Sequence, residues 1–357
     1  MRQPPTDGPI VFGILHPPEW FSDTDAFAAA CRSLEATDPR LEVLVVPYDE
    51  GQAMRTMRGN AQHLERARSE APALTDAQRE MFERVHAVLA IDLPFDVAQL
   101  APNLCWVQGI GAGSAQLQSA GLAASGIRLS NAAGVNAVGI AEFVIGRLLE
   151  ERKRFVELAK HQQQHDWTPL YGTQLAGATV GLIGFGAINS AVAARLQAFD
   201  VTVLATRRSA KPGDRADNVD ELYPASQLHD MLTRCDTVIA AVPESPDTAG
   251  LMDATAFAAM PASSFFVNVG RGSFVDEAAL IAALRSGHLR GAALDVAHAE
   301  PLPADDPLWL APNLRLSFHC ASSPSAMFVN LYRLVAENLR RWLNNEELQN
   351  EILSDRA

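Results

Sequence analysis

Short apolar runs alternate with amphipathic segments along the first third of the chain. Between the runs, the spacing of apolar residues predicts helices, for example over Thr24–Leu34 and Thr75–Arg84. Strands that alternate with helices are typical of a parallel sheet covered by helices, so we expect a doubly wound α/β domain here. The predicted strands are Ile10–Leu15, Leu41–Pro47, Ala87–Ile91, Leu104–Gln108 and Arg128–Ser130.

The pattern changes near Asn131. One long helix is predicted over Val135–Arg154, followed by a polar connector over His161–Tyr171. A second alternation of strands and helices begins at Thr179, which predicts a second parallel sheet. Its predicted strands are Val180–Ile183, Val201–Ala205, Thr237–Val242, Phe265–Val269, Gly291–Val296 and Leu314–Phe318.

Capping residues place the later helices. After a helix over Ala187–Phe199, Ser226 is the expected N-cap of a helix that ends near Arg234, and Asp276 caps a helix that Gly287 ends. The last helix begins at Ser323-Pro324, with proline at its first position, and ends near Asn344. No strand follows this helix, so we expect it to pack back on the first domain. The chain is thus divided into residues 1–131 with 319–357, and an inserted domain of residues 132–318.

Composition narrows the class of protein. The chain has 357 residues, 48% hydrophobic and 20% charged, which suits two soluble globular domains. The formal charge of −13 argues against nucleic acid or an anionic membrane as partner. The N-terminal segment lacks the apolar core of a signal peptide, and no apolar run is long enough to span a bilayer. Scattered cysteines without a CxxC pair predict reduced thiols in a cytoplasmic protein: Cys31, Cys105, Cys235 and Cys320.

The segment GLIGFGAIN, residues 181–189, has the form of a dinucleotide-binding turn between a strand and a helix. Gly184 permits the tight turn, Gly186 permits close approach of the pyrophosphate, and the amides at the start of the helix face the phosphates. Asn189 takes the place of the third glycine, so we expect a slightly displaced helix rather than a lost site. The predicted cofactor contacts in this turn are Gly184, Phe185, Gly186, Ala187 and Ile188.

The next strand end predicts which nicotinamide cofactor binds. An NAD site typically has a carboxylate about 20 residues beyond the turn, to bind the ribose 2′-hydroxyl. This chain has Thr206, Arg207, Arg208 and Ser209 there, whose guanidinium and hydroxyl groups suit a 2′-phosphate. We therefore predict NADPH, with NAD as the weaker alternative. The other interpretation is a solvated arginine pair on a loop.

Three polar residues in apolar, strand-like surroundings are the candidate catalytic groups. Arg271 can hold an anionic 2-keto acid, His319 can supply a proton, and Glu300 can orient the histidine and favour its charged form. Each alone has a structural alternative: an arginine in an ion pair, a glutamate before a proline-rich turn, a histidine in the core. A metal site from His298, Glu300, His319 and Cys320 is a further alternative, but no helical histidine pair or CxxC supports it, and we predict no metal.

Together these motifs resemble the D-isomer-specific 2-hydroxyacid dehydrogenase family over nearly the whole chain. The matching pieces, in order, include NAAGVNAVGIAEFVIG, TVGLIGFGAIN, FFVNVGRGSFVDEAAL, GAALDVAHAEPLP and FHCASS. The resemblance implies that Arg271 contacts the substrate, that Glu300 pairs with the acid/base His319, and that backbone amides of Ala112 and Gly113 bind the substrate carboxylate. It also implies further cofactor contacts, at Val242, Pro243, Val269, Gly270 and Asp295.

The chain departs from the family pattern at positions around the substrate pocket. Phe318 stands where proline is usual, and Cys320 stands where an aliphatic residue is common. Ala297 replaces a frequent aromatic residue, and Ser114-Ala115 replaces a frequent Val-Asp pair. These changes bear on which substrate binds more than on the type of reaction.

The resemblance implies a Rossmann nucleotide-binding domain inserted into a flavodoxin-like substrate domain, with the active site in the cleft between them. The expected reaction is NADPH-dependent reduction of a small 2-keto acid, such as glyoxylate or hydroxypyruvate, to the D-2-hydroxy acid. A homodimer is also implied, with the Val135–Arg154 helix in its interface. The alternative is a catalytically silent, dinucleotide-sensing protein of the same fold.

Overall fold

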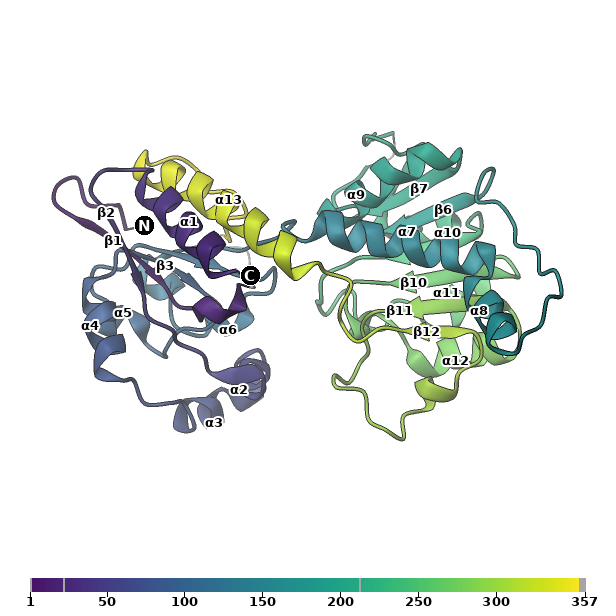
Figure 1. Ribbon diagram of the computed structural model, residues 1–357, viewed down its shortest axis with the longest axis horizontal. Helices are drawn as coiled ribbons and strands as arrows, with labels where there is room; N and C mark the ends of the chain where they lie inside the picture. The colour runs from purple at the N-terminus through teal and green to yellow at the C-terminus, as the bar shows by residue number, and fades with distance from the viewer. Residues whose placement is uncertain (1, 22, 212, 353–357) are drawn as a thin grey trace. The chain divides into compact units, whose positions relative to one another are not determined.

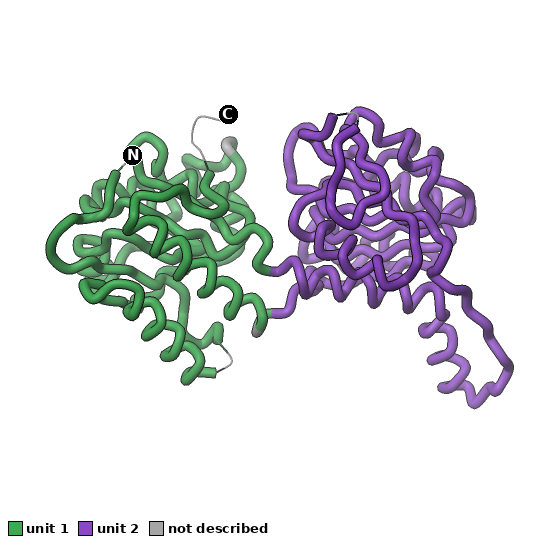
Figure 2. The backbone as a smooth tube through the Cα atoms, turned by 90° about the horizontal axis from the view of Figure 1, so that it is seen from above, with its two compact units in different colours: residues 1–135, 324–357 green, residues 136–323 purple. Residues whose placement is uncertain are grey.

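The computed structural model describes residues 2–21, 23–211 and 213–352, which form two compact units (Figure 2). Unit 1 comprises the residues up to Val135 and those from Pro324 onward, and unit 2 comprises Asn136–Ser323. The boundaries predicted from the sequence lie at 131/132 and 318/319. Each unit is built on one parallel sheet, which confirms the predicted α/β class. None of the described helices is long and apolar enough to cross a membrane.

The sheet of unit 1 has the strand order β2-β1-β3-β4-β5, and all its pairs are parallel. This is the flavodoxin-like order. Alternate side chains of the first strand enter two cores, Ile10 and Phe12 on one face and Val11 on the other, so both faces are covered. The strands are β1 (Ile10–Ile14), β2 (Leu41–Val45), β3 (Ala87–Ala90), β4 (Trp106–Gly109) and β5 (Arg128–Ser130).

The last helix of the chain completes the core of unit 1. In Figure 1 this helix, α13, lies beside α1. Phe328, Leu331 and Trp342 of α13 share a core with Phe12 and Trp106, as predicted for a helix that packs back on the first domain. The helices of unit 1 are α1 (Thr24–Glu35), α2 (Gly51–Arg58), α3 (Leu64–Ser69), α4 (Asp76–Arg84), α5 (Val97–Leu100), α6 (Ala115–Gln118) and α13 (Pro324–Leu343).

The sheet of unit 2 has the order β12-β11-β10-β9-β6-β7-β8, again with all pairs parallel. Counted from β6, this is the Rossmann order with one added strand. The order reverses between β6 and β9, and sheets of this kind bind ligands at such a point, beyond the carboxyl ends of the strands. The strands are β6 (Thr179–Ile183), β7 (Thr202–Arg207), β8 (Glu221–Pro224), β9 (Thr237–Ala240), β10 (Ser264–Asn268), β11 (Leu289–Leu294) and β12 (Leu314–Leu316).

Helix α7, predicted as one long helix, packs against α9, where Ala141 and Val144 share a core with Val192 and Ala193. Both helices therefore cover the same face of the sheet. Only three residues separate the end of β6 at Ile183 from the start of α9 at Ala187, so the packing of α9 also positions the turn between them. The helices of unit 2 are α7 (Ala137–Lys153), α8 (Phe155–Gln163), α9 (Ala187–Leu196), α10 (Leu228–Leu232), α11 (Ala254–Ala259) and α12 (Glu277–Arg285).

Three features of unit 2 correct the sequence prediction. The predicted connector begins inside a helix, because Arg154 takes a left-handed backbone (φ 57°) that ends α7 and α8 then starts at once. The predicted N-cap at Ser226 is wrong, since Ser226 lies within a 3-10 turn and α10 begins at Leu228 without a side-chain cap. Strand β8 was not predicted, because its short sequence ELYP has no apolar run. The predicted cap at Asp276 is confirmed by its bond from the Ala279 amide (3.0 Å).

Candidate active site

The carboxyl edge of the unit 2 sheet carries most of the predicted site residues. Because all seven strands are parallel, their carboxyl ends meet along the same edge of the sheet. Gly184 follows β6, Asp295 follows β11, and His319 lies three residues beyond the end of β12 at Leu316. The predicted contacts after β9 and β10 also lie at this edge: Val242, Pro243, Val269 and Gly270.

The glycine turn between β6 and α9 is shaped for a phosphate group. Gly184 has φ 82°, and a Cβ there would overlap the side chain of Val242, so only glycine fits without strain. Gly186 is the N-cap of α9, and a Cβ on it would meet no atom within 4 Å, so the space over the turn is open. The first amides of a helix lack intrahelical acceptors, which leaves those of Ala187 and Ile188 free to bind an anion.

Thr206, predicted as a cofactor contact, supports the glycine turn from the neighbouring strand. Its side chain is buried, and its hydroxyl accepts a hydrogen bond from the Gly184 amide (3.2 Å). The Thr206 carbonyl accepts a second bond, from the Phe185 amide (2.7 Å). These contacts place Thr206 behind the turn, so its direct contact with a cofactor stays a prediction.

The three residues after Thr206 are at least partly exposed, and two of them carry positive charge. Arg208 and Ser209 are exposed, whereas Arg207 is half-buried. The Nε atom of Arg207 is buried and has no hydrogen-bond partner among the described residues. No carboxylate of the described chain lies within 4.0 Å of either guanidinium. The end of β7 therefore has two cationic groups whose charge is not neutralised by the protein around them.

Glu300 and His319 form a hydrogen-bonded pair. His319 Nδ1 lies 2.7 Å from Glu300 Oε2, and Glu300 Oε1 accepts the amide of Ala297 (3.0 Å). This second bond fixes the carboxylate, which then fixes the ring that it contacts. The side chains are 55% and 39% exposed, so the imidazole edge that faces away from Glu300 is accessible to a ligand.

The segment that carries His319 is held by Asp295. One carboxylate oxygen of Asp295 accepts the Ser317 hydroxyl (2.8 Å) and the Cys320 amide (3.0 Å), and the other accepts the Ala321 amide (3.1 Å). The Asp295 carbonyl accepts the His319 amide (2.7 Å). Asp295 is almost fully buried. We find it bound to the histidine segment, a role that the sequence did not reveal, while its contact with the nicotinamide stays a prediction.

Arg271 lies on a tight turn after β10 that is built by its neighbours. The buried side chain of Asn268 accepts the Gly270 amide (3.0 Å) and donates to the Arg271 carbonyl (2.9 Å). A Cβ at Gly272 would overlap the backbone at Ala297, so glycine lets this turn lie directly against the segment that leads to Glu300. Arg271 Nη1 donates to the Gly270 carbonyl (2.8 Å), which leaves the rest of the guanidinium for other acceptors.

Ala112 and Gly113 lie in unit 1, on the loop that follows β4. Asn131 Nδ2 donates to the Ala112 carbonyl (2.7 Å), and the Ala132 amide donates to the Gly111 carbonyl (2.9 Å). These bonds turn the carbonyls of the loop toward the protein. Asn131 was predicted as the point where the pattern changes and as the end of the first segment of the substrate domain, but neither prediction included this contact.

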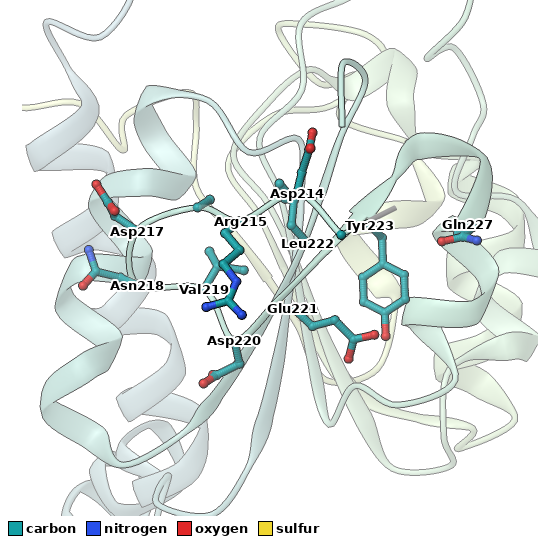
Figure 3. Close-up of a pocket in the computed structure, with 12 residues that line it drawn as sticks. Asp214, Arg215, Asp217, Asn218, Val219, Asp220, Glu221, Leu222, Tyr223 and Gln227 are labelled. Carbon is teal, nitrogen blue, oxygen red and sulfur yellow. The ribbon is translucent and has the colours of Figure 1, made fainter. Parts of the chain in front are cut away.

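Two cavities lie elsewhere in unit 2. The larger, about 850 Å³, is lined by the loop that precedes β8, by residues of β8 itself and by Gln227 (Figure 3). Its ionisable side chains are mostly acidic, with only Arg215 positive, so it is unsuited to an anionic substrate or a phosphate. The second, about 500 Å³, has arginines that pair with glutamates, such as Arg290 with Glu151 (2.7 Å). Neither cavity includes a predicted site residue, and no group of three potential metal ligands occurs among the described residues.

A Rossmann-type sheet with a paired carboxylate and histidine at its carboxyl edge is an arrangement that suits a nucleotide-dependent dehydrogenase. Residues 145–321 match the NAD binding domain of the D-isomer specific 2-hydroxyacid dehydrogenases. The chain is also 32% identical over 260 residues to a glyoxylate reductase of Thermofilum pendens, a match that covers 70% of this chain and 75% of that protein. The chain belongs to the D-isomer specific 2-hydroxyacid dehydrogenase family, as its motifs predicted.

Other relatives and solved structures agree with this family. A D-3-phosphoglycerate dehydrogenase of Mycobacterium leprae is 34% identical over 253 residues, covering 70% of this chain but 47% of that protein. The structure of a family member from Xanthobacter autotrophicus Py2, in complex with NADPH and MES, has a TM-score of 0.71 and 27% identity, covering 97% and 98% of the two chains. An NADPH-dependent glyoxylate/hydroxypyruvate reductase from Sinorhizobium meliloti has a TM-score of 0.68 and 28% identity, covering 96% and 97%.

Proposed function

We propose that this chain reduces a small 2-keto acid, such as glyoxylate or hydroxypyruvate, to the D-2-hydroxy acid with NADPH. The observation that carries the proposal is the 2.7 Å contact between His319 Nδ1 and Glu300 Oε2, at the sheet edge that also carries the glycine turn. The glyoxylate reductase of T. pendens among its relatives supports the substrate class.

His319 is the proposed proton donor. Glu300 accepts the Nδ1 proton of the ring and fixes the orientation of the imidazole, which leaves the Nε2 proton for the substrate. When bound, NADPH supplies the hydride that adds to the carbonyl carbon. As the carbon–oxygen double bond becomes single, the oxygen takes the proton from His319 Nε2, and the product is the neutral hydroxyl of a 2-hydroxy acid.

Arg271 is the proposed substrate anchor. Its guanidinium is always charged and presents a planar set of donors, which suits the carboxylate and the carbonyl oxygen of a 2-keto acid. The amides of Ala112 and Gly113 in unit 1 are proposed to bind the substrate carboxylate, since the loop's carbonyls at Gly111 and Ala112 are already bonded to residues 131 and 132.

The residues at the end of β7 fit a 2′-phosphate. Arg207 has a buried Nε without an acceptor among the described residues, and an anion placed there would satisfy it. Arg208 and Ser209 beside it are exposed and add a charge and a hydroxyl. The same positions hold no carboxylate for the 2′-hydroxyl of NADH. The Xanthobacter structure, which contains NADPH, supports this choice.

A homodimer and a cytoplasmic location belong to the same proposal. Helix α8 and the segment that follows it expose large apolar groups, among them Trp167 (97% exposed) and Tyr171 (86%). The resemblance to the family implies a dimer with the Val135–Arg154 helix in its interface, and α8 follows that helix directly, so we propose a second copy of the chain as the partner of this surface. The described cysteines are all free, which suits a reducing compartment.

The experiment is a reductase assay that follows reduced-nicotinamide absorbance. Purified protein would be given NADPH or NADH with glyoxylate, hydroxypyruvate, pyruvate, bulkier 2-keto acids and phosphohydroxypyruvate, the last because of the phosphoglycerate dehydrogenase relatives. We expect turnover of a small 2-keto acid, faster with NADPH. Tight NADPH binding without turnover of any acid would instead favour a dinucleotide-sensing protein and contradict the proposed activity.

A further inference from the structure

Asn189 stands where the dinucleotide motif has its third glycine, in the first turn of α9. Its side chain is fully buried beneath the glycine turn. The Nδ2 group donates one hydrogen bond to the Ile183 carbonyl (2.9 Å) and another to the Gly184 carbonyl (3.0 Å). The asparagine therefore fills the space that a glycine would leave and also bonds to the turn.

Asn189 and Thr206 hold the same two peptide groups from opposite ends. In the peptide that joins Ile183 to Gly184, the carbonyl accepts from Asn189 and the amide donates to the Thr206 hydroxyl (3.2 Å). In the next peptide, the Gly184 carbonyl accepts from Asn189 and the Phe185 amide donates to the Thr206 carbonyl (2.7 Å). Two successive peptides of the turn are thus bonded at both ends.

A turn held in this way is ordered before any ligand arrives. The glycine in it has access to many backbone conformations, and a ligand that binds a loose turn must order it at a cost in affinity. The Ile183 and Gly184 carbonyls also accept the backbone amides of Ala241 (3.1 Å) and Gly186 (2.9 Å), and the bonds from Asn189 add a side-chain restraint to both of them next to the helix start at Gly186. The asparagine supplies rigidity at the point where the usual motif relies on close packing of a glycine.

We propose that Asn189 is a positioning residue of the cofactor site, which orders the pyrophosphate-binding turn through the carbonyls of Ile183 and Gly184. This inference rests on the proposed binding of NADPH. Its distinctive consequence concerns Asn189→Gly, which restores the glycine motif. If the glycine were simply missing, this change would improve binding of the cofactor. Because the asparagine orders the turn, Asn189→Gly should instead weaken binding of the cofactor.

The test is the affinity of wild type, Asn189→Gly and Asn189→Ala for NADPH, measured by quenching of protein fluorescence. Loss of two neutral hydrogen bonds should raise the Kd for NADPH about three- to tenfold in both variants. The Kd for adenosine 2′-monophosphate, which lacks the pyrophosphate, should change less than about twofold, because that ligand does not need the turn. In turnover assays the KM for NADPH should rise while kcat at saturating NADPH and the KM for the keto acid stay near wild type.

Asn338→Ala is the matched control. Asn338 is equally buried and also donates two hydrogen bonds from Nδ2, to Gln108 Oε1 (2.9 Å) and the Gln349 carbonyl (3.0 Å), but it lies in unit 1. Its loss should lower stability without changing the Kd for NADPH. Wild-type affinity in Asn189→Gly, or an equal loss of affinity for adenosine 2′-monophosphate, would overturn the inference. Absence of NADPH binding by the wild type would overturn the proposed function instead.

Discussion

His319 has a left-handed backbone (φ 54°), which few residues with a side chain adopt. Its neighbours impose this conformation, because the amides of His319 and of the two residues that follow are all bonded to Asp295. An unusual backbone that is fixed by a buried carboxylate fits the proposed function of the histidine. The histidine ring is thereby directed toward Glu300 before a substrate binds.

Removal of the histidine or of its partner should have different effects. His319→Ala should lower kcat/KM about 100- to 10,000-fold, since the positioned proton donor is lost. Glu300→Gln keeps the shape of the contact but removes the negative charge beside the ring, so kcat should fall by less than in His319→Ala, because the proton donor itself remains. His229→Ala, at an exposed position on α10, is the control and should behave as wild type. Near-normal turnover of His319→Ala would contradict the proton-donor assignment.

The preference for NADPH is predicted to depend on Arg207. Arg207→Asp would place a carboxylate where NAD sites have one, so the ratio of kcat/KM for NADPH to that for NADH should fall at least about tenfold. Steady-state kinetics with both cofactors measures this ratio. A matched change at Arg66, which pairs with Glu70 on the surface of unit 1, should leave it unaltered. An unchanged ratio in Arg207→Asp would show that the 2′-phosphate binds elsewhere.

At the scale of elements, the turns after strands are fixed by asparagines. Asn268 holds the turn of Arg271, Asn189 the glycine turn, and Asn131 the loop of unit 1 that carries Ala112. A side-chain amide suits this task because it offers donors and an acceptor to the backbone of a turn. None of these bonds could be predicted from the sequence, since asparagine is favoured in turns of every kind and its spacing does not show which backbone group it contacts.

Asn131→Ala should therefore weaken binding of the keto acid without changing the affinity for NADPH. The loss of the bond to the Ala112 carbonyl frees the loop, so the KM for the keto acid should rise about three- to tenfold. The Kd for NADPH should not change, because the cofactor turn lies in unit 2. Parallel kinetic and fluorescence measurements separate the two. A rise in the Kd for NADPH with an unchanged KM for the acid would contradict the proposed role of the loop.

His16 joins β1 to α13 in the core of unit 1. Its ring is fully buried, and its Nε2 atom lies 2.8 Å from the Tyr332 hydroxyl. Nδ1 lies 2.9 Å from the Pro17 carbonyl, so a neutral ring that donates from Nδ1 and accepts at Nε2 satisfies both contacts. Burial lowers the pKa of His16 below its usual value. The interior thus favours the uncharged form.

The lowered pKa of His16 should make the stability of the protein depend on pH. The unfolded chain binds a proton at His16 more readily than the folded chain, so the free energy of unfolding should fall as the pH drops below about 6.5. His16→Phe cannot titrate, and its stability should depend less on pH between about 7 and 5. Urea unfolding at several pH values measures the free energy of unfolding of wild type and of His16→Phe, with His229→Ala as the control. Equal pH dependence in wild type and His16→Phe would contradict the prediction.

At the scale of the whole molecule, the sequence predicted the two α/β sheets and the family, because apolar periodicity and ordered motifs are local signals. It missed β8 and the start of α8, where edge position and a backbone reversal at Arg154 decide the structure. The sequence predicted that Asp295 and Thr206 belong to the site. It did not predict that Asp295 bonds to the histidine segment or that Thr206 bonds to the glycine turn. Those contacts join strands that are distant in sequence, which spacing alone does not reveal.

The proposed dimer can be tested through its exposed aromatic residues. Substitution of both Trp167 and Tyr171 by Glu would place charge on an apolar surface, so light scattering after gel filtration should show a shift from dimer toward monomer. Leu310→Glu, at another exposed apolar position, is the control. A wild-type mass of one chain would contradict the dimer.

The place of α13 in the core of unit 1 bears on how the protein forms during synthesis. Phe328, Leu331 and Trp342 are made after the whole of unit 2, yet they complete the core around Phe12 and Trp106. Domains usually fold as their segments leave the ribosome, beginning with the first. Here unit 2 is complete when Ser323 has emerged, while the strands of unit 1, made before it, still lack α13. The core of unit 1 can therefore close only after unit 2 has been made, although most of its residues precede unit 2 in the chain.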